Sequence, residues 1–421
     1  MNYYPFPEKR TNQYLFALVV LGLLILNRDS MYSMAVLGLY PSLLGGYGLV
    51  GVLGIAFLAV NRGNWKGIVA DKRLLLALAA AAVMLLPMLF KRDWQLMYIN
   101  ILLCVYIAIF FSYFLRIGEL ARYYVTVITG LAVASLLALY VLRPLTDAGL
   151  LNPPVVRNAI NVEIYNYGIS FVPITFVKNR NFGIFREPGV YQYFILLGIY
   201  LNNYWVNWNR EWKLWTVNAV LAVTMLSTFA TGGVIELGLM CIVMFFDKGW
   251  YRDRKLRIAA AALAAAAIAL VGYCIAVKNG LYWALYDMIM KFTDNPESTG
   301  ARVGSIVVNL KFFLSHPLVG DRLHDVLHLT GVSEAVVTNT SSTMILFAVY
   351  GILGGCFGVI GWIALVWEKN RRVWANLALL VILFMSFNTQ NLTWDLFFWL
   401  FPIMALCQRG LPLLDKYMKK G

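Results

Sequence analysis

The chain has 421 residues, of which 61% are hydrophobic, 15% aromatic and only 13% charged, and its formal net charge at pH 7 is +14. A soluble protein of this length needs about 25% charged residues to cover its surface, so the composition argues against a soluble domain and predicts a polytopic membrane protein. Nucleic acid is not an expected partner, because Lys and Arg lie in short segments between apolar runs rather than on one basic face. The five cysteines fall inside apolar runs and are expected to be core residues.

Apolar runs long enough to cross a bilayer, roughly 17–25 residues each, recur along the whole chain. They predict an all-α polytopic membrane protein with about twelve transmembrane helices, no cleavable signal peptide and no separate soluble domain. The predicted spans are residues 12–27, 38–60, 74–90, 96–115, 123–142, 190–206, 214–230, 232–247, 258–277, 341–367, 373–387 and 394–408.

The distribution of charge predicts the orientation of these spans. Lys and Arg are concentrated in every second connecting segment, for example 248–257 and 369–372, and are few in the short connections between them. The positive-inside rule therefore places the N- and C-termini in the cytoplasm. It leaves two long extracytoplasmic loops, 143–189 and 278–340, within a single integral membrane domain. The apolar stretch from Ile169 to Val177 in the first loop is expected to lie along the membrane or dip into it.

The first long loop ends in a cluster of charge beside a Pro-Gly turn, where the chain re-enters the membrane. Arg180 and Arg186 offer planar forks of donors that suit phosphate oxygens and keep their charge. Glu187, beside Arg186, is a candidate acceptor for sugar hydroxyls or a weak general base. The alternative is an interfacial anchor, in which the arginines extend toward lipid headgroups.

The second long loop contains an amphipathic helix, predicted over about 299–314 from apolar residues at three- and four-residue spacing. Ser298 or Thr299 is the expected N-cap, and His316-Pro317 ends the helix, because proline cannot continue it. Arg302 stands in the first turn, where the helix dipole disfavours a cation, which suggests an anionic ligand shared with the helix N-terminus. The alternative is an exposed arginine on a solvated face.

Three other features carry weaker signals. His324 and His328, like His316, lack a third ligand or an HExxH glutamate, so no metal site is predicted and surface or packed histidines are expected. The polar run that starts at Asn339 opens the tenth span, where its hydroxyls either cap the helix or bind a sugar. Charged residues are almost missing from the span interiors, with Glu236 as the main exception. This scarcity argues against an ion-coupled transporter.

Three segments resemble, in the same order along the chain, motifs of the O-antigen polymerase and ligase superfamily of bacterial membrane glycosyltransferases. They are an R-x-x-G-x-F-x-x-P pattern at 180–188, an arginine before a helix that ends in Pro-Leu-x-Gly (Arg302 and 317–320), and the Gly-Ile-x-Gly at 351–354. Two departures stand out. Thr340-Ser341 occupies the place of a His-Asn pair that is common in ligases, which favours a polymerase, and 230–233 (Ala-Thr-Gly-Gly) replaces a serine and arginine.

The resemblance implies a GT-C-like membrane enzyme that polymerises polyprenyl-diphosphate-linked oligosaccharide repeats on the outer face of the bacterial cytoplasmic membrane. It implies inversion at the anomeric carbon and requires no metal or nucleotide cofactor. The implied partners are the lipid-linked donor and acceptor, membrane lipids, a chain-length regulator and a flippase. The assigned catalytic residues are Arg186, Glu187 and Arg302. The assigned substrate-binding residues are Arg180, Arg157, Tyr191, Arg322, His324 and Asn339.

Two alternatives share parts of this pattern. A ligase that moves the finished glycan to a different acceptor has the same architecture. A transporter of lipid-linked oligosaccharide requires a hydrophilic cavity lined by residues within the spans, which the sequence offers sparingly.

Overall fold

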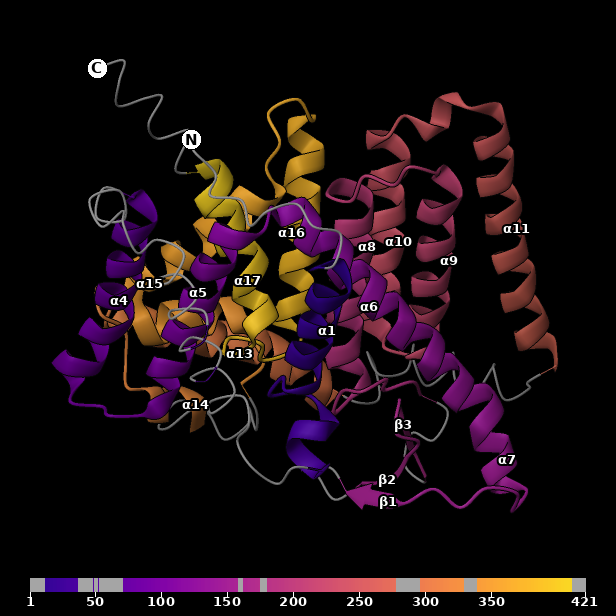
Figure 1. The fold of residues 1–421 in the computed structure, drawn as a ribbon, viewed down its shortest axis with the longest axis horizontal. Coiled ribbons are helices and arrows are strands. Elements are labelled where there is room, and N and C mark those ends of the chain that lie inside the picture. The colour runs from indigo at the N-terminus through magenta and orange to yellow at the C-terminus, as the bar shows by residue number, and fades with distance from the viewer. Residues whose placement is uncertain are drawn as a thin grey trace.

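The computed structural model describes residues 12–36, 48, 52, 71–157, 162–174, 180–277, 296–328 and 339–410. Most of them are helical, and most of the helices run side by side along the vertical direction of Figure 1. The helices are α1 (Asn12–Ile25), α4 (Lys72–Lys91), α5 (Leu96–Phe114), α6 (Ile117–Leu137), α7 (Arg143–Asp147), α8 (Pro188–Tyr204), α9 (Glu211–Ser227), α10 (Thr231–Asp247), α11 (Arg254–Val277), α13 (Pro296–Ser315), α14 (Leu323–His328), α15 (Ser342–Val366), α16 (Val373–Asn388) and α17 (Leu396–Ala405). Short π- or 3-10 turns lie at Tyr32–Val36, Ala138–Leu142, Trp250–Arg252 and Leu406–Gly410.

Several of these helices have the length and composition of membrane spans. In the described ranges, four are long and apolar enough to cross a bilayer: Lys72–Lys91, Leu96–Phe114, Ile117–Asp147 and Ser342–Val366. Each predicted span that falls in the described part of the chain coincides with a helix. The predicted span 38–60 lies outside the described residues. The chain is therefore a helical membrane protein.

The fold is not entirely helical, contrary to the all-α prediction. The first long loop carries a small antiparallel sheet in the order β1 (Val155–Arg157), β2 (Glu163–Asn166), β3 (Phe171–Pro173). Its strands are rich in β-branched and aromatic residues, which favour extended backbone, but each is too short to give a clear alternating pattern. β3 falls within the stretch that was expected to lie along or dip into the membrane, and the part of this stretch at 175–177 lies outside the described residues.

The connections between helices divide between two ends of the bundle (Figure 1). The α8–α9, α10–α11 and α15–α16 connections lie at the upper end, whereas the sheet, α7 and α14 lie at the lower end. The upper connections contain the basic segments 205–210, 248–253 and 367–372. The up-and-down order of the helices thus gathers the most basic connections at one end.

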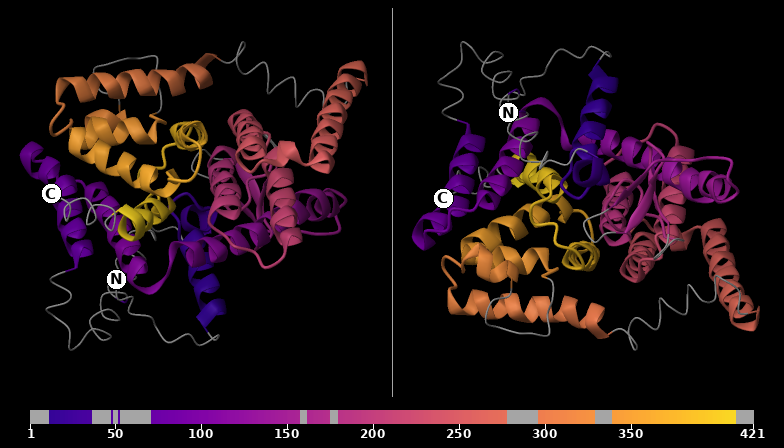
Figure 2. Two further views of the ribbon diagram at one scale, coloured as in Figure 1. Left: turned by 90° about the horizontal axis from the view of Figure 1, so that it is seen from above. Right: turned by 90° about the horizontal axis from the view of Figure 1, so that it is seen from below.

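The helix predicted over about 299–314 is confirmed as α13, which lies across the bundle rather than along it. Seen from above and below, α13 appears along its length, in orange (Figure 2), and it packs against α15. It begins at Pro296, before both predicted caps, because proline suits the first turn of a helix, where its missing N–H has no partner to lose. It ends at Ser315, as the His316-Pro317 sequence predicts.

The segments 317–320 and 351–354, which carry the second and third motifs of the sequence analysis, contact each other through their backbones. Gly351 interrupts α15 with a φ of 64°, and the N–H of Ile352 donates to the carbonyl of Pro317 over 2.8 Å. A Cβ at Gly351 would overlap the carbonyl of Leu318, and one at Gly320, whose φ is 68°, would overlap the backbone of Val349. Glycine is required at both places, because an L side chain disfavours positive φ and no room is left for one.

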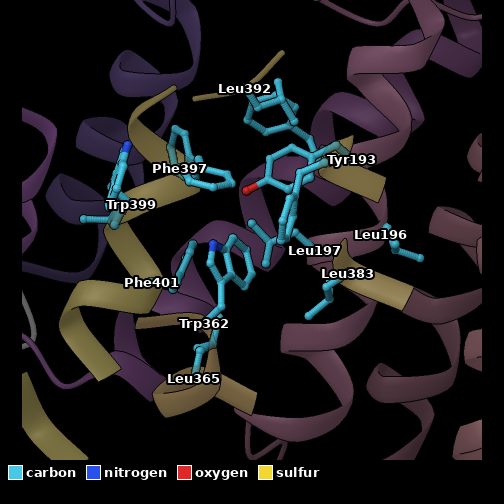
Figure 3. Close-up of a cluster of buried hydrophobic side chains, with 14 of the residues drawn as sticks. Tyr193, Leu196, Leu197, Trp362, Leu365, Leu383, Leu392, Phe397, Trp399 and Phe401 are labelled. Atoms are coloured by element: carbon cyan, nitrogen blue, oxygen red, sulfur yellow. The ribbon is translucent and has the colours of Figure 1, made fainter. Parts of the chain in front are cut away.

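The core of the bundle joins α8, α15, α16 and α17. In Figure 3, Tyr193 and Leu197 of α8 face Trp362 of α15 and Phe397 of α17, with Leu383 of α16 beneath them. All five are buried. The core therefore fixes α8, which carries the Arg186–Gly189 turn at its start, against the C-terminal half of the chain.

Candidate functional site

The segment at the end of the first long loop folds into a tight turn held by buried hydrogen bonds. Asn181 is the centre of this turn: its backbone N–H donates to the carbonyl of Ser227, and its side-chain amide donates to the hydroxyls of Ser135 and Ser227. Gly183 has a φ of 58° and lies on the ring of Tyr191, where an added Cβ would approach ring carbons to 2.7 Å. The turn therefore sits rigidly on the ends of α6, α8 and α9.

Arg186 is held by Asp29, which lies after α1. The Nε of Arg186 lies 2.8 Å from Oδ1 of Asp29, and its backbone N–H donates to the carbonyl of the same residue. Ser30 and Phe185 form an antiparallel bridge beside this pair. Burial works against the charged form of Arg186, but Asp29 and Glu187 outweigh burial and raise its pKa above the usual value. Arg186 is therefore a fixed, permanently charged group.

Asp29 in turn belongs to a buried network that reaches α17. Its backbone N–H donates to the side-chain oxygen of Asn27, and the Asn27 amide donates to Oδ2 of Asp395 over 2.6 Å. The other oxygen of Asp395 accepts from the N–H groups of Phe397 and Phe398 at the start of α17. The α1–α17 junction thus positions the carboxylate that holds Arg186.

Arg180 and Arg302 come from separate long loops and lie close enough for the charge of Arg302 to act on Arg180. Burial lowers the pKa of Arg180 to about 10; Glu187 opposes this shift, and the charge of Arg302 adds to it. Burial also lowers the pKa of Arg302, and Glu187 and Glu236 oppose the shift. Four charged residues from 180–187, α10 and α13 therefore share one region, which we call the charged cluster: Arg180, Glu187, Glu236 and Arg302.

Among the residues that the structure describes, the two arginines of the charged cluster use few of their donors. Arg180 donates from Nε to the carbonyl of Thr228 over 2.9 Å. In the part of the chain that the structure describes, no carboxylate forms an ion pair with Arg180, and the guanidinium of Arg302 makes neither a hydrogen bond nor an ion pair. A guanidinium carries five N–H donors, so this region is suited to an anion with several oxygens.

Glu187 links Arg186 to the other residues of the charged cluster. Its Oε1 is 3.3 Å from a terminal nitrogen of Arg186, and its side chain is 38% exposed. It directly precedes α8, whose first turn contains Pro188 and Gly189. A Cβ at Gly189 would overlap the side chain of Gln390, so the missing side chain allows α8 to start directly against the α16–α17 connection.

The assigned residues Arg157, Arg322 and His324 lie away from the charged cluster. Arg157 belongs to β1, where it is exposed and forms a 2.7 Å ion pair with Glu163. Arg322 and His324 are exposed on or beside α14, and the ring of His324 lies 4.5 Å from that of His328. In Figure 1, α14 and the sheet lie on opposite sides of α1. The structure therefore does not bring these three side chains together.

The assigned residues Tyr191 and Asn339 are buried in the protein. Tyr191 packs under Gly183 and its hydroxyl lies 3.2 Å from that of Ser135. Asn339 exchanges two amide hydrogen bonds with Asn309 of α13, at 2.8 and 2.9 Å, and also donates to the carbonyl of Val326. Both residues support the elements that carry the arginines.

Two members of this site were not assigned from the sequence. Asp29 lies in a short connection beside Arg28, and no local pattern distinguishes it from an ordinary loop residue. Glu236 does give a signal, because it is an acidic residue inside an apolar run. Across the described ranges, no group of three or more His, Cys, Asp or Glu side chains is placed to hold a metal ion. Comparisons with protein-family models, with curated proteins and with solved structures found no match.

Proposed function

We propose that this protein is a polysaccharide polymerase that joins polyprenyl-diphosphate-linked oligosaccharide repeats on the outer face of a bacterial cytoplasmic membrane. The observation that carries the proposal is the convergence of Arg180 and Arg302, from two distant loops, with most of their donors free of partners in the described part of the chain. Two like charges repel each other in a half-buried region, and no carboxylate among the described residues forms an ion pair with either arginine, which favours binding of a polyanion. A lipid diphosphate has the required charge and oxygens.

The proposed reaction is a displacement at the anomeric carbon of the donor sugar. A hydroxyl oxygen of the acceptor repeat forms the new bond to this carbon, and the bond from the carbon to the diphosphate oxygen breaks with its electron pair. Glu187 takes the hydroxyl proton and passes it to solvent, since its carboxylate is partly exposed. The leaving group is already activated, so no cofactor is required. A direct displacement inverts the configuration at the carbon.

The arginines stabilise the charge that builds on the departing diphosphate. Arg186 is held in place by Asp29 before substrate arrives, and such preorganised donors lower the barrier without reorganisation. Arg180 and Arg302 bind the remaining phosphate oxygens. The location of the charged cluster supports an outer-face reaction, because the α9–α10 turn and the start of α8 lie at the end of the bundle opposite the basic connections.

The test is polymer synthesis by variants expressed in a strain that lacks this protein but makes the lipid-linked repeat. Arg180→Ala and Arg302→Ala are each expected to reduce polymer formation by about 10²–10³-fold, the effect typical of losing one donor to a developing anion. The matched control is Arg252→Ala, an exposed arginine at the opposite end of the bundle, which is expected to retain full synthesis.

The product also separates the polymerase from the two other activities. A ladder of increasing length, made from the lipid-linked repeat alone, supports a polymerase. A single transfer to a different acceptor identifies a ligase, and movement of intact lipid-linked repeat across vesicles without a new glycosidic bond identifies a transporter. Normal ladders from both arginine variants would contradict the proposed site.

A further inference from the structure

A second group of buried polar atoms shares Glu236 with the charged cluster and lies where α8, α10 and α16 pack together. It consists of Gln192, Glu236 and Ser386, whose residues are 2%, 0% and 0% exposed. Within the described chain, Oε1 of Gln192, both carboxylate oxygens of Glu236 and Oγ of Ser386 have no hydrogen-bond partner. Leaving so many buried polar atoms unpaired is unfavourable, which points to a ligand that completes them.

The three side chains come close to one another. Measured from the position that a Cβ would take on Gly232, Oε1 of Glu236 lies at 3.6 Å and the two amide atoms of Gln192 at 3.4 and 3.7 Å. Ser386 lies beside the carboxylate of Glu236. The side-chain amide nitrogen of Gln192 already donates to the hydroxyl of Thr389 over 3.0 Å, so its free atom is the acceptor oxygen. The group therefore presents acceptors to one small region.

The polar atoms of Gln192, Glu236 and Ser386 indicate which class of ligand this group binds. Acceptor oxygens require donors, whereas a phosphate offers mainly further acceptor oxygens and is therefore disfavoured at this group. A simple cation is disfavoured by the nearby charge of Arg302. A neutral polyhydroxyl compound supplies several O–H donors and carries no charge. It is the class that fits both the acceptors and the adjacent guanidinium.

We propose that Gln192, Glu236 and Ser386 form a saccharide subsite that binds hydroxyl groups of the acceptor repeat next to the diphosphate. This inference rests on the proposed function and deepens it by naming the residues that hold the acceptor. Gly232 contributes by lacking a side chain, because the space that a methyl group would take lies against both Gln192 and Glu236.

Ser386→Ala is the sharpest variant. In the described chain its hydroxyl lies beside the carboxyl group of Glu236 without the geometry of a hydrogen bond, so removing it is expected to change the melting temperature of the purified protein little. If the hydroxyl binds the acceptor, polymer synthesis falls by about tenfold, the effect of one lost hydrogen bond. Glu236→Gln keeps the shape, replaces one carboxyl oxygen with an amide NH₂ donor and is expected to reduce synthesis further.

Gly232→Ala tests the space itself. The added methyl group lies at ordinary contact distances of 3.4–3.7 Å, so the fold tolerates it, while the saccharide is displaced. Gly238→Ala is the matched control on the same helix, since a Cβ there meets nothing within 4 Å among the described atoms. Synthesis is expected to fall with Gly232→Ala and to stay normal with Gly238→Ala.

Binding of a radiolabelled short-chain polyprenyl diphosphate, which carries no sugar, separates this inference from the proposed function. The subsite is supported if Ser386→Ala, Glu236→Gln and Gly232→Ala lose ladders but bind this probe within about twofold of the unmodified protein. It is overturned if these variants make normal ladders, or if they lose the probe as well. If the unmodified protein neither binds the probe nor makes ladders, the proposed function fails instead.

Discussion

At the residue scale, the site depends on how each arginine is held. Arg186 is fixed by an ion pair and a backbone hydrogen bond to Asp29, whereas Arg180 and Arg302 are half-buried and have donors that no described residue pairs. This difference predicts different roles for Arg186 and for the other two arginines. A guanidinium that is already paired stays in position through the reaction, and those with free donors are the ones that gain most from an incoming anion.

Asp29 is expected to act through Arg186 rather than on the substrate. Asp29→Asn removes the ion pair and should reduce polymer synthesis by roughly tenfold, because Arg186 loses its fixed orientation. In an Arg186→Ala background the same change should have no further effect. Asp147→Asn, which breaks the Arg143–Asp147 ion pair, is the control and should leave synthesis unchanged. Additive losses in the double variant would contradict this role.

The lowered pKa of Arg180 predicts a pH dependence. Its guanidinium is charged below about pH 10 and is neutralised above it, so affinity for a short-chain polyprenyl diphosphate should be constant from pH 8 to about 9.5 and then fall. The effect of pH on folding stability has the opposite sign. The unfolded chain binds the proton of Arg180 more tightly than the folded protein does, so the contribution of Arg180 to the free energy of unfolding rises as the pH passes 10. Binding measured against pH in Arg180→Gln should be weak and lack the fall near pH 10.

At the scale of elements, the junction between α15 and the segment after α13 fixes where Arg302 sits. Gly320 and Gly351 interlock with positive φ values, and Lys91 donates to the carbonyls of Asp321 and Val349 across the same junction. The side chain of Lys91, held by these two backbone carbonyls, ties α4 to the junction. The glycines that resemble a family motif therefore have a packing role here.

Gly351→Ala is expected to destabilise the protein by on the order of 1–3 kcal/mol, because the new Cβ meets the carbonyl of Leu318 at a φ that alanine disfavours. Thermal unfolding of the purified protein measures the effect. Gly130→Ala on α6 is the control, since its Cβ meets no described atom within 4 Å and alanine favours the helix. Equal melting temperatures for the two variants would contradict the proposed interlock.

At the scale of the whole molecule, the orientation in the membrane is open to a direct test. In a background without native cysteines, Leu150→Cys near the sheet should react with an impermeant maleimide in intact spheroplasts, because this end is expected to face outward. Arg252→Cys, in a basic connection at the opposite end, should react only after permeabilisation. Reaction of both sites in intact spheroplasts would contradict the orientation.

The sequence by itself determined the class of fold, because a bilayer imposes long apolar helices whose composition and length can be read directly. It also predicted α13 from its apolar spacing, and its end from His316-Pro317. Tertiary structure decided the rest. The short strands β1–β3, the partnership of Asp29 with Arg186 and the proximity of Glu236 to Arg302 depend on contacts between residues far apart in the chain, which no local pattern encodes.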